Sequence, residues 1–136
     1  MAPNLDPPGG AAPEPFGGNL DLKVMDQLLD LDDGAVGLVK EMYGLFQQDT
    51  PDRIQAIEAL LAAGDRDGTA DVAHAIKGAA GTMGAHRLRT VAAEFEGSAR
   101  KGSFQVEPEE LVARMKAAYA DARDALEAFI RTRETA

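Results

Sequence analysis

Apolar residues that recur at helical spacing are the feature that most constrains the fold of this chain. They lie three or four positions apart in successive segments, and short glycine-containing breaks separate one segment from the next. We find no alternating pattern that predicts a strand. We therefore predict an all-α protein. Short connections join helices that run in opposite directions, so the expected architecture is an antiparallel up-down four-helix bundle with a short extra N-terminal helix.

Glycine and proline indicate where the first helices begin and end. A short helix is expected at residues 20–32, and Asp33-Gly34 directly after it ends the helix. The next apolar stripe runs through residues 36–61 and contains Pro51, which either kinks one long helix or starts a new one. We favour one kinked helix, ended by Ala63-Gly64-Asp65.

Three further helices are expected in the second half of the chain. The first begins near Thr69, capped by Asp67 or by Thr69 itself, and ends near Gly84. The second ends at Gly102. The last begins at Pro108, since proline suits the first turn of a helix.

The composition changes sharply near residue 18. Residues 1–18 contain five prolines and four glycines and have little apolar periodicity. Such a segment cannot bury enough surface to offset its chain entropy. We therefore predict a disordered tail at residues 1–18 and one bundle domain at residues 19–136.

The charge of the chain restricts its partners. Its 136 residues carry a net charge of −9 and include no cysteine. Nucleic acids and anionic membranes bind basic surfaces, so we expect neither as a partner. No apolar run approaches the length of a membrane span and no signal peptide is visible, so we expect a cytoplasmic protein. Residues 74–101 carry a net +3, which would steer an acidic partner to this region.

His74 lies in the middle of its expected helix, on a face with little bulk. Positions three, four and seven further along share that face, and they are Lys77, Gly78 and Gly81. Each glycine costs roughly 1 kcal/mol relative to alanine in a helix, so we infer that a partner approaches the backbone here. The opposite face should lie in the core, and it consists of Val72, Ile76, Ala79 and Met83.

The string His74-x-x-Lys77-Gly78-x-x-Gly81-x-x-Gly84 resembles the histidine-containing phosphotransfer (Hpt) domains of two-component phosphorelays. The resemblance extends from about Asn19 to the C-terminus. It also includes Asp49-Thr50-Pro51, Ala63-Gly64-Asp65 and Leu88 with Glu94-Phe95-Glu96.

The resemblance implies a phosphorelay carrier with a four-helix-bundle fold. His74 would accept a phosphoryl group from a receiver-domain aspartate and pass it to another receiver. Lys77 would stabilise the charge of the phosphate. We expect no cofactor in this chain. The receiver would supply Mg²⁺, because no carboxylates cluster around His74. The expected partners are response-regulator receiver domains, with a hybrid histidine kinase as a further candidate, and the domain itself is expected to be a monomer.

Other residues near His74 are candidates for contact with the partner. Gly78 and Gly81 would leave room for it, and Arg89 and Glu96 on the following helix would line the site. For Arg89 and Glu96 we favour the simpler interpretation of a solvated face. His86 is interpreted as a surface residue, because no metal ligands lie at zinc-type spacing from it.

Two alternative functions remain open. The chain could be the phospho-accepting domain of a chemotaxis-type histidine kinase, phosphorylated from ATP by a separate kinase domain. It could also dock a receiver without transferring phosphate, although the presence of both His74 and Lys77 argues against this. The sequence contains no nucleotide-binding or hydrolase motif, so we expect no ATP site in this chain.

Overall fold

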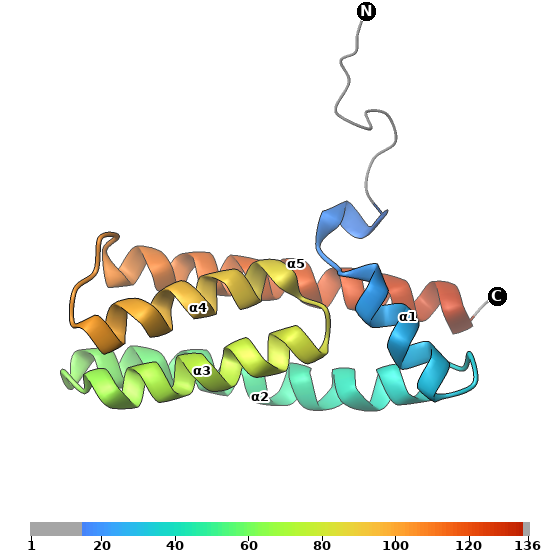
Figure 1. Cartoon of the computed structure of the whole chain (residues 1–136), viewed down its shortest axis with the longest axis horizontal. Coiled ribbons are helices and arrows are strands. Elements are labelled where there is room, and N and C mark those ends of the chain that lie inside the picture. Colours follow the sequence, from blue (N-terminus) through green and yellow to red (C-terminus); the bar gives the residue numbers. More distant parts are fainter. Residues whose placement is uncertain (1–14, 135–136) are drawn as a thin grey trace, which may run out of the picture.

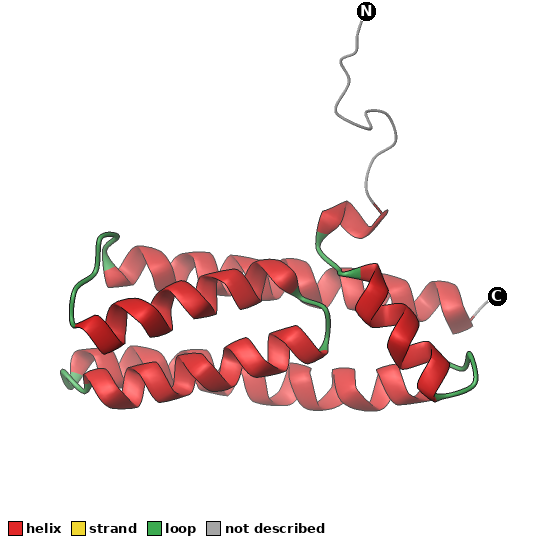
Figure 2. Cartoon of the chain, in the orientation of Figure 1, coloured by secondary structure: helices red, strands yellow, loops and turns green. Residues whose placement is uncertain are grey.

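A computed structural model describes residues 15–134 and shows the predicted helical bundle (Figure 1). All regular structure in these residues is helical (Figure 2). The four long helices α2 to α5 run antiparallel to their neighbours in the chain, and α1 lies across one end of the bundle. The elements are η1 (Pro15–Gly18), α1 (Leu22–Leu31), α2 (Gly37–Ala62), α3 (Arg66–Thr82), α4 (His86–Lys101) and α5 (Pro108–Glu134).

The start of α1 is fixed to the turn between α3 and α4. Asp21 caps α1 by accepting a hydrogen bond from the amide of Lys23 at 3.0 Å, and its own amide donates to the carbonyl of Gly84 at 2.8 Å. Gly84 has a φ of 70°, and a Cβ there would lie 3.1 Å from the carbonyl oxygen of Asp21. Glycine is therefore needed for the predicted turn and for the close approach of α1.

Helix α2 continues without a break across Pro51, as we favoured from the sequence. Proline has no amide hydrogen, so the carbonyl of Gln47, four residues earlier, loses its partner within the helix. The hydroxyl of Tyr119 on α5 donates to this carbonyl at 3.4 Å. A contact between helices thus satisfies the group that the proline leaves free.

The beginning of α3 differs from the prediction. The helix begins at Arg66, and Asp65 caps it by accepting a hydrogen bond from the amide of Gly68 at 2.8 Å. Asp67 and Thr69, which we predicted as caps, lie inside the first turns. Thr69 is buried, and its hydroxyl donates to the carbonyl of Asp65. Aspartate is a favourable cap at either position, so the sequence alone did not distinguish them.

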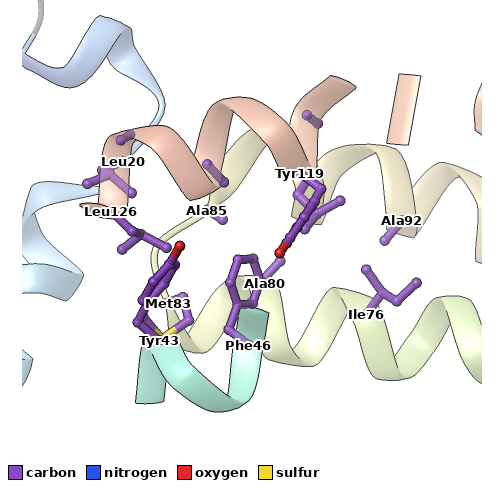
Figure 3. Close-up of a cluster of buried hydrophobic side chains, with 14 of the residues drawn as sticks. Leu20, Tyr43, Phe46, Ile76, Ala80, Met83, Ala85, Ala92, Tyr119 and Leu126 are labelled. Atoms are coloured by element: carbon purple, nitrogen blue, oxygen red, sulfur yellow. The ribbon is translucent and has the colours of Figure 1, made fainter. Parts of the chain in front are cut away.

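The buried side of α3 is wider than the predicted stripe. Val72 and Ala79 are only partly buried, whereas Ala73 and Ala80 are fully buried. The reason is that α3 packs against both α2 and α4. The fully or almost fully buried apolar residues in this region are Ala70, Ala73, Ile76, Ala80 and Met83. Figure 3 shows three of them, Ile76, Ala80 and Met83, in the core.

The tail predicted at residues 1–18 falls mostly on residues 1–14, which lie outside the described residues. Its end differs from the prediction, because residues 15–18 form the single turn η1 and pack on the bundle. The rings of Phe16 and Phe129 on α5 make an edge-to-face contact, with 5.7 Å between the ring centroids. Residues before Asn19 therefore already pack on the bundle, and α5 provides the surface for this contact.

Candidate histidine phosphorylation site

Helix α3 presents His74, Lys77, Gly78 and Gly81 along the side that faces away from the core. The side chain of His74 is 64% exposed and that of Lys77 is 31% exposed. A Cβ added at Gly78 would meet no other atom within 4 Å. The structure thus leaves open space one turn along the helix from the imidazole, as the spacing of these residues predicted.

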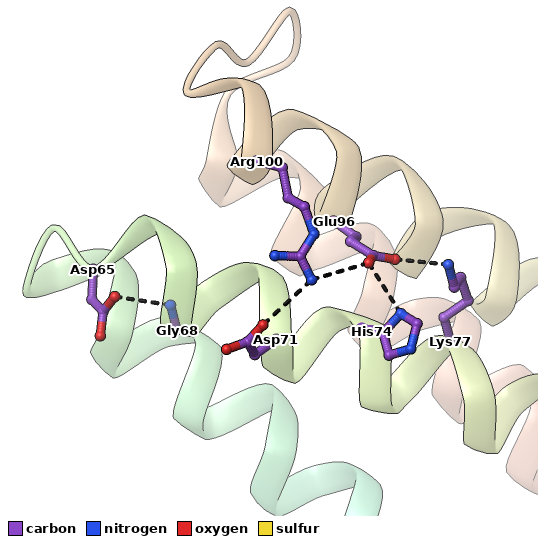
Figure 4. Close-up of polar contacts among 7 residues, drawn as sticks. All are labelled: Asp65, Gly68, Asp71, His74, Lys77, Glu96 and Arg100. Carbon is purple, nitrogen blue, oxygen red and sulfur yellow. Dashed lines mark hydrogen bonds and ion pairs between the residues drawn. The ribbon is translucent and has the colours of Figure 1, made fainter.

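Glu96 on α4 contacts both His74 and Lys77 of α3 (Figure 4). Its Oε2 lies 3.0 Å from Nδ1 of His74, and its Oε1 lies 2.8 Å from Nζ of Lys77. Only 14% of the Glu96 side chain is exposed. Our interpretation of Glu96 as part of a solvated face was therefore wrong. The hairpin of α3 and α4 turns near Ala85, midway between residues 74 and 96, and this register brings the two side chains together.

The surroundings of Glu96 keep its carboxyl group ionised at neutral pH. Its pKa lies below the ordinary value, mainly because Lys77 donates a hydrogen bond to it. Partial burial raises the pKa of Glu96, while the charge of Lys77 and the hydrogen bond from His74 lower it further. An ionised carboxylate can only accept hydrogen bonds, so Nδ1 of His74 must carry a proton.

The contact with Glu96 therefore determines which imidazole nitrogen can react. When Nδ1 carries the proton in a neutral imidazole, Nε2 holds the lone pair. No hydrogen bond to Nε2 of His74 is present among residues 15–134. The arrangement can thus supply an exposed nitrogen nucleophile on a fixed ring.

Arg100 and Asp71, which the sequence did not predict as site residues, extend this polar cluster. Nη2 of Arg100 lies 3.3 Å from Oε2 of Glu96 and 3.3 Å from Oδ1 of Asp71. Arg100 follows Glu96 by four residues and Asp71 precedes His74 by three, so both spacings place the residues on shared helix faces. Once Glu96 is known to be part of the site, those spacings predict that Arg100 and Asp71 lie close to it.

Arg89, a predicted partner-binding residue, lies on α4 beside Gly81 of α3. A Cβ at Gly81 would be 3.4 Å from Cδ and Nε of Arg89. A depression of about 480 Å³ opens beside these residues, between α1, α3 and α4. Lys77, Gly78 and the surface residue His86 also line it. Within the described part of the chain Arg89 forms no ion pair, so its charge is available to a partner.

The described residues contain neither a metal-binding cluster nor a membrane-spanning helix. Between residues 15 and 134 no three His, Cys, Asp or Glu side chains gather in a way that could hold a metal ion. In the same range no helix is both long and apolar enough to span a bilayer.

Residues 41–129 match the model of the Hpt domain family. The chain belongs to this family. Among solved structures it is similar to histidine-containing phosphotransfer protein B (HptB) from Pseudomonas aeruginosa, with a TM-score of 0.72 and 28% sequence identity. That match covers 85% of this chain and 96% of HptB. No curated protein sequence matches the chain.

A second solved structure supports the same fold for this Hpt domain. It is the histidine-containing phosphotransfer domain of ArcB from Escherichia coli, with a TM-score of 0.69 and 24% identity. The match covers 83% of this chain and 93% of the ArcB domain. The family assignment thus agrees with the bundle fold.

Proposed function

We propose that this Hpt domain accepts a phosphoryl group on Nε2 of His74 from the aspartate of one receiver domain and passes it to the aspartate of another. A phosphotransfer role in two-component signalling follows from the family. The observation that supports His74 as the acceptor is its exposed imidazole, with Nδ1 engaged by Glu96. An exposed nucleophile on a rigid helix suits a reaction that depends mainly on positioning.

The proposed step requires little chemistry from the domain itself. The lone pair of Nε2 attacks phosphorus, the bond from phosphorus to the aspartate oxygen breaks, and the aspartate leaves as a carboxylate. The ring then carries a positive charge, because Nδ1 keeps its proton while Nε2 is phosphorylated. Glu96 stabilises that charge through its hydrogen bond. In this proposal the receiver would supply the Mg²⁺, which would neutralise charge on the phosphate oxygens during transfer.

Lys77 provides a cation next to the new phosphoryl group. A phosphoryl group adds about −1.5 to −2 charges at neutral pH, so a nearby ammonium group stabilises it. Lys77 is one turn from His74 and pairs with Glu96 in the unphosphorylated domain. We propose that its flexible side chain shifts toward the phosphate after transfer.

The receiver docks on the open face of α3 in this proposal. Gly78 and Gly81 leave space beside His74, and Arg89 offers an unpaired charge to an acidic receiver surface. The net +3 charge of residues 74–101 favours the approach of such a partner to an otherwise acidic protein. The glycines provide access and the basic residues provide attraction.

The test is phosphotransfer from a panel of phosphorylated receivers to the purified chain. Wild type should acquire a label that is labile in acid and stable in base, as expected for phosphohistidine. His74→Gln should acquire none, whereas the matched His86→Gln variant should label like wild type. Labelling of His74→Gln at the wild-type rate would refute the assignment. A label acquired only from ATP with a separate kinase domain would favour the kinase-domain alternative.

A further inference from the structure

A chain of polar contacts links α3 and α4 beside the phosphorylation site. Asp71 and His74 lie one turn apart on α3, and Glu96 and Arg100 lie one turn apart on α4 (Figure 4). Nη2 of Arg100 lies 3.3 Å from a carboxylate oxygen of each helix. Arg100 is therefore a bridge between the helices as well as a partner of Glu96 within its own helix.

Two cations hold the Glu96 carboxylate in one orientation. Lys77 contacts Oε1, and Arg100 contacts Oε2, which is also the oxygen that faces Nδ1 of His74. A glutamate side chain has several rotatable bonds and loses this freedom when its carboxylate is fixed. Contacts to both oxygens leave the carboxylate little freedom to rotate away from the imidazole.

We propose that Arg100 is a positioning residue for phosphorylation: by bridging Asp71 and Glu96 it holds Oε2 of Glu96 against Nδ1 of His74, and so keeps the proton on Nδ1 and the lone pair on Nε2. The functional part of this inference rests on the proposed acceptance of phosphate by His74. Arg100 does not touch the reacting atom and acts only through Glu96.

A second arginine–glutamate ion pair in the same protein serves as a control for a purely structural role. Arg114 and Glu110 on α5 have the same four-residue spacing, and the Arg114 side chain is 47% exposed against 48% for Arg100. Among the described residues Arg114 forms no hydrogen bond or ion pair with another helix. Exposed pairs of this kind contribute little to stability, so neither arginine should matter much for folding. Only the loss of Arg100 should change the state of His74.

The experiment compares Arg100→Ala, Arg100→Lys and the control Arg114→Ala with wild type. The proton position on His74 is measured from the ¹⁵N chemical shifts of its ring, and the labelling rate is measured with phosphoramidate as a small phosphodonor. We expect Arg100→Ala to lower the population with the proton on Nδ1. We expect it to slow labelling about two- to fivefold, the size that an exposed ion pair can produce.

The conservative variant and the control make the result specific. Arg100→Lys should recover part of both effects, because an ammonium group can pair with Glu96 but lacks the guanidinium fork. Arg114→Ala should match wild type in both measurements. If the ring shifts and labelling rate of Arg100→Ala equal those of Arg114→Ala, the proposal is overturned. If phosphoramidate labels no histidine in wild type, the proposed function fails, and the ring shifts still decide the role of Arg100.

Discussion

The α3–α4 pair and the α2–α5 pair belong to one bundle but use side chains of different size. Helices α3 and α4 are in the most extensive contact of any pair, and many of the residues they bury are alanines, including Ala73, Ala80, Ala92 and Ala99. Helices α2 and α5 instead pack through large side chains such as Phe46 and Tyr119, whose rings lie 5.5 Å apart (Figure 3). Small buried residues let two helices approach closely, whereas large ones fill the space between them.

This difference separates the proposed phosphorylation site from the main source of stability. The close approach of α3 and α4 allows Glu96 to reach His74 and Lys77 across the helix interface. The large side chains of α2 and α5 remove more apolar surface from water and so provide more of the hydrophobic stabilisation. Mutations in the two pairs should therefore affect different measurements.

The largest effect on stability is expected for Phe46→Ala. Phe46 is 4% exposed and lies against Tyr119, so its removal leaves a cavity and should cost about 3–5 kcal/mol. Labelling of His74 by a small phosphodonor should persist in the folded protein, because Phe46 is a core residue that packs against Tyr119 on α5. Urea unfolding measures the loss of stability. The control is Leu45→Ala, whose side chain is 61% exposed and should change stability little. Complete loss of labelling in folded Phe46→Ala would show that the site on α3 and α4 is not independent of the packing between α2 and α5.

A smaller loss of stability with a larger loss of function is expected for Ala92→Leu. Ala92 is fully buried on α4, one turn before Glu96, and added bulk there should cost about 1–3 kcal/mol. The leucine should also push α4 away and weaken the contact of Glu96 with His74. Small-donor labelling should therefore fall more than in Phe46→Ala. The matched control is Ala93→Leu, an exposed position on the same helix. Equal labelling by the two leucine variants would show that helix spacing does not control the site.

Gly78→Ala should raise stability by about 0.5–1 kcal/mol, because alanine favours the helix and its Cβ meets no neighbour. Transfer from a receiver should fall only modestly. Gly78→Arg should stay helical yet lose receiver transfer by a large factor, while labelling by phosphoramidate is retained better. Gly44 is an exposed helical glycine with the same free space, so Gly44→Ala and Gly44→Arg are the controls. Normal receiver transfer by Gly78→Arg would place the docking surface elsewhere.

The features that the sequence predicted well are those that depend on local conformation. Gly64, Gly84 and Gly102 all have positive φ at the ends of helices, which glycine adopts without strain, so their positions indicated the breaks correctly. The exposure of His74 and Gly78 also followed from helical spacing alone. These predictions needed only the geometry of one helix.

The features that were missed depend on how two helices pack. Glu96 meets His74 because of the register between α3 and α4, which no spacing within one helix determines. Arg100 could be recognised only after Glu96 was placed. Phe16 packs on Phe129, more than a hundred residues further along the chain, so the composition around it gave no signal of order. Tertiary contacts of this kind determine the site and the N-terminal boundary.

The smallest expected effect is the pH-dependent contribution of Glu96 to stability. Its folded-state pKa lies below the ordinary value of 4.5, chiefly because of the hydrogen bond from Lys77. A group with a lowered pKa stabilises the folded state above its unfolded pKa, and this contribution is lost as the pH falls through the folded-state pKa. Glu96→Gln should therefore lower the Tm slightly near pH 7, and the difference from wild type should shrink as the pH falls below 4.5 and disappear once the pH is below the folded-state pKa of Glu96. Glu94→Gln, an exposed position on the same helix with no ion pair among the described residues, should match wild type throughout. A Tm difference for Glu96→Gln that stays constant from neutral to acidic pH would mean that the shape of this side chain, and not its charge, holds α3 to α4.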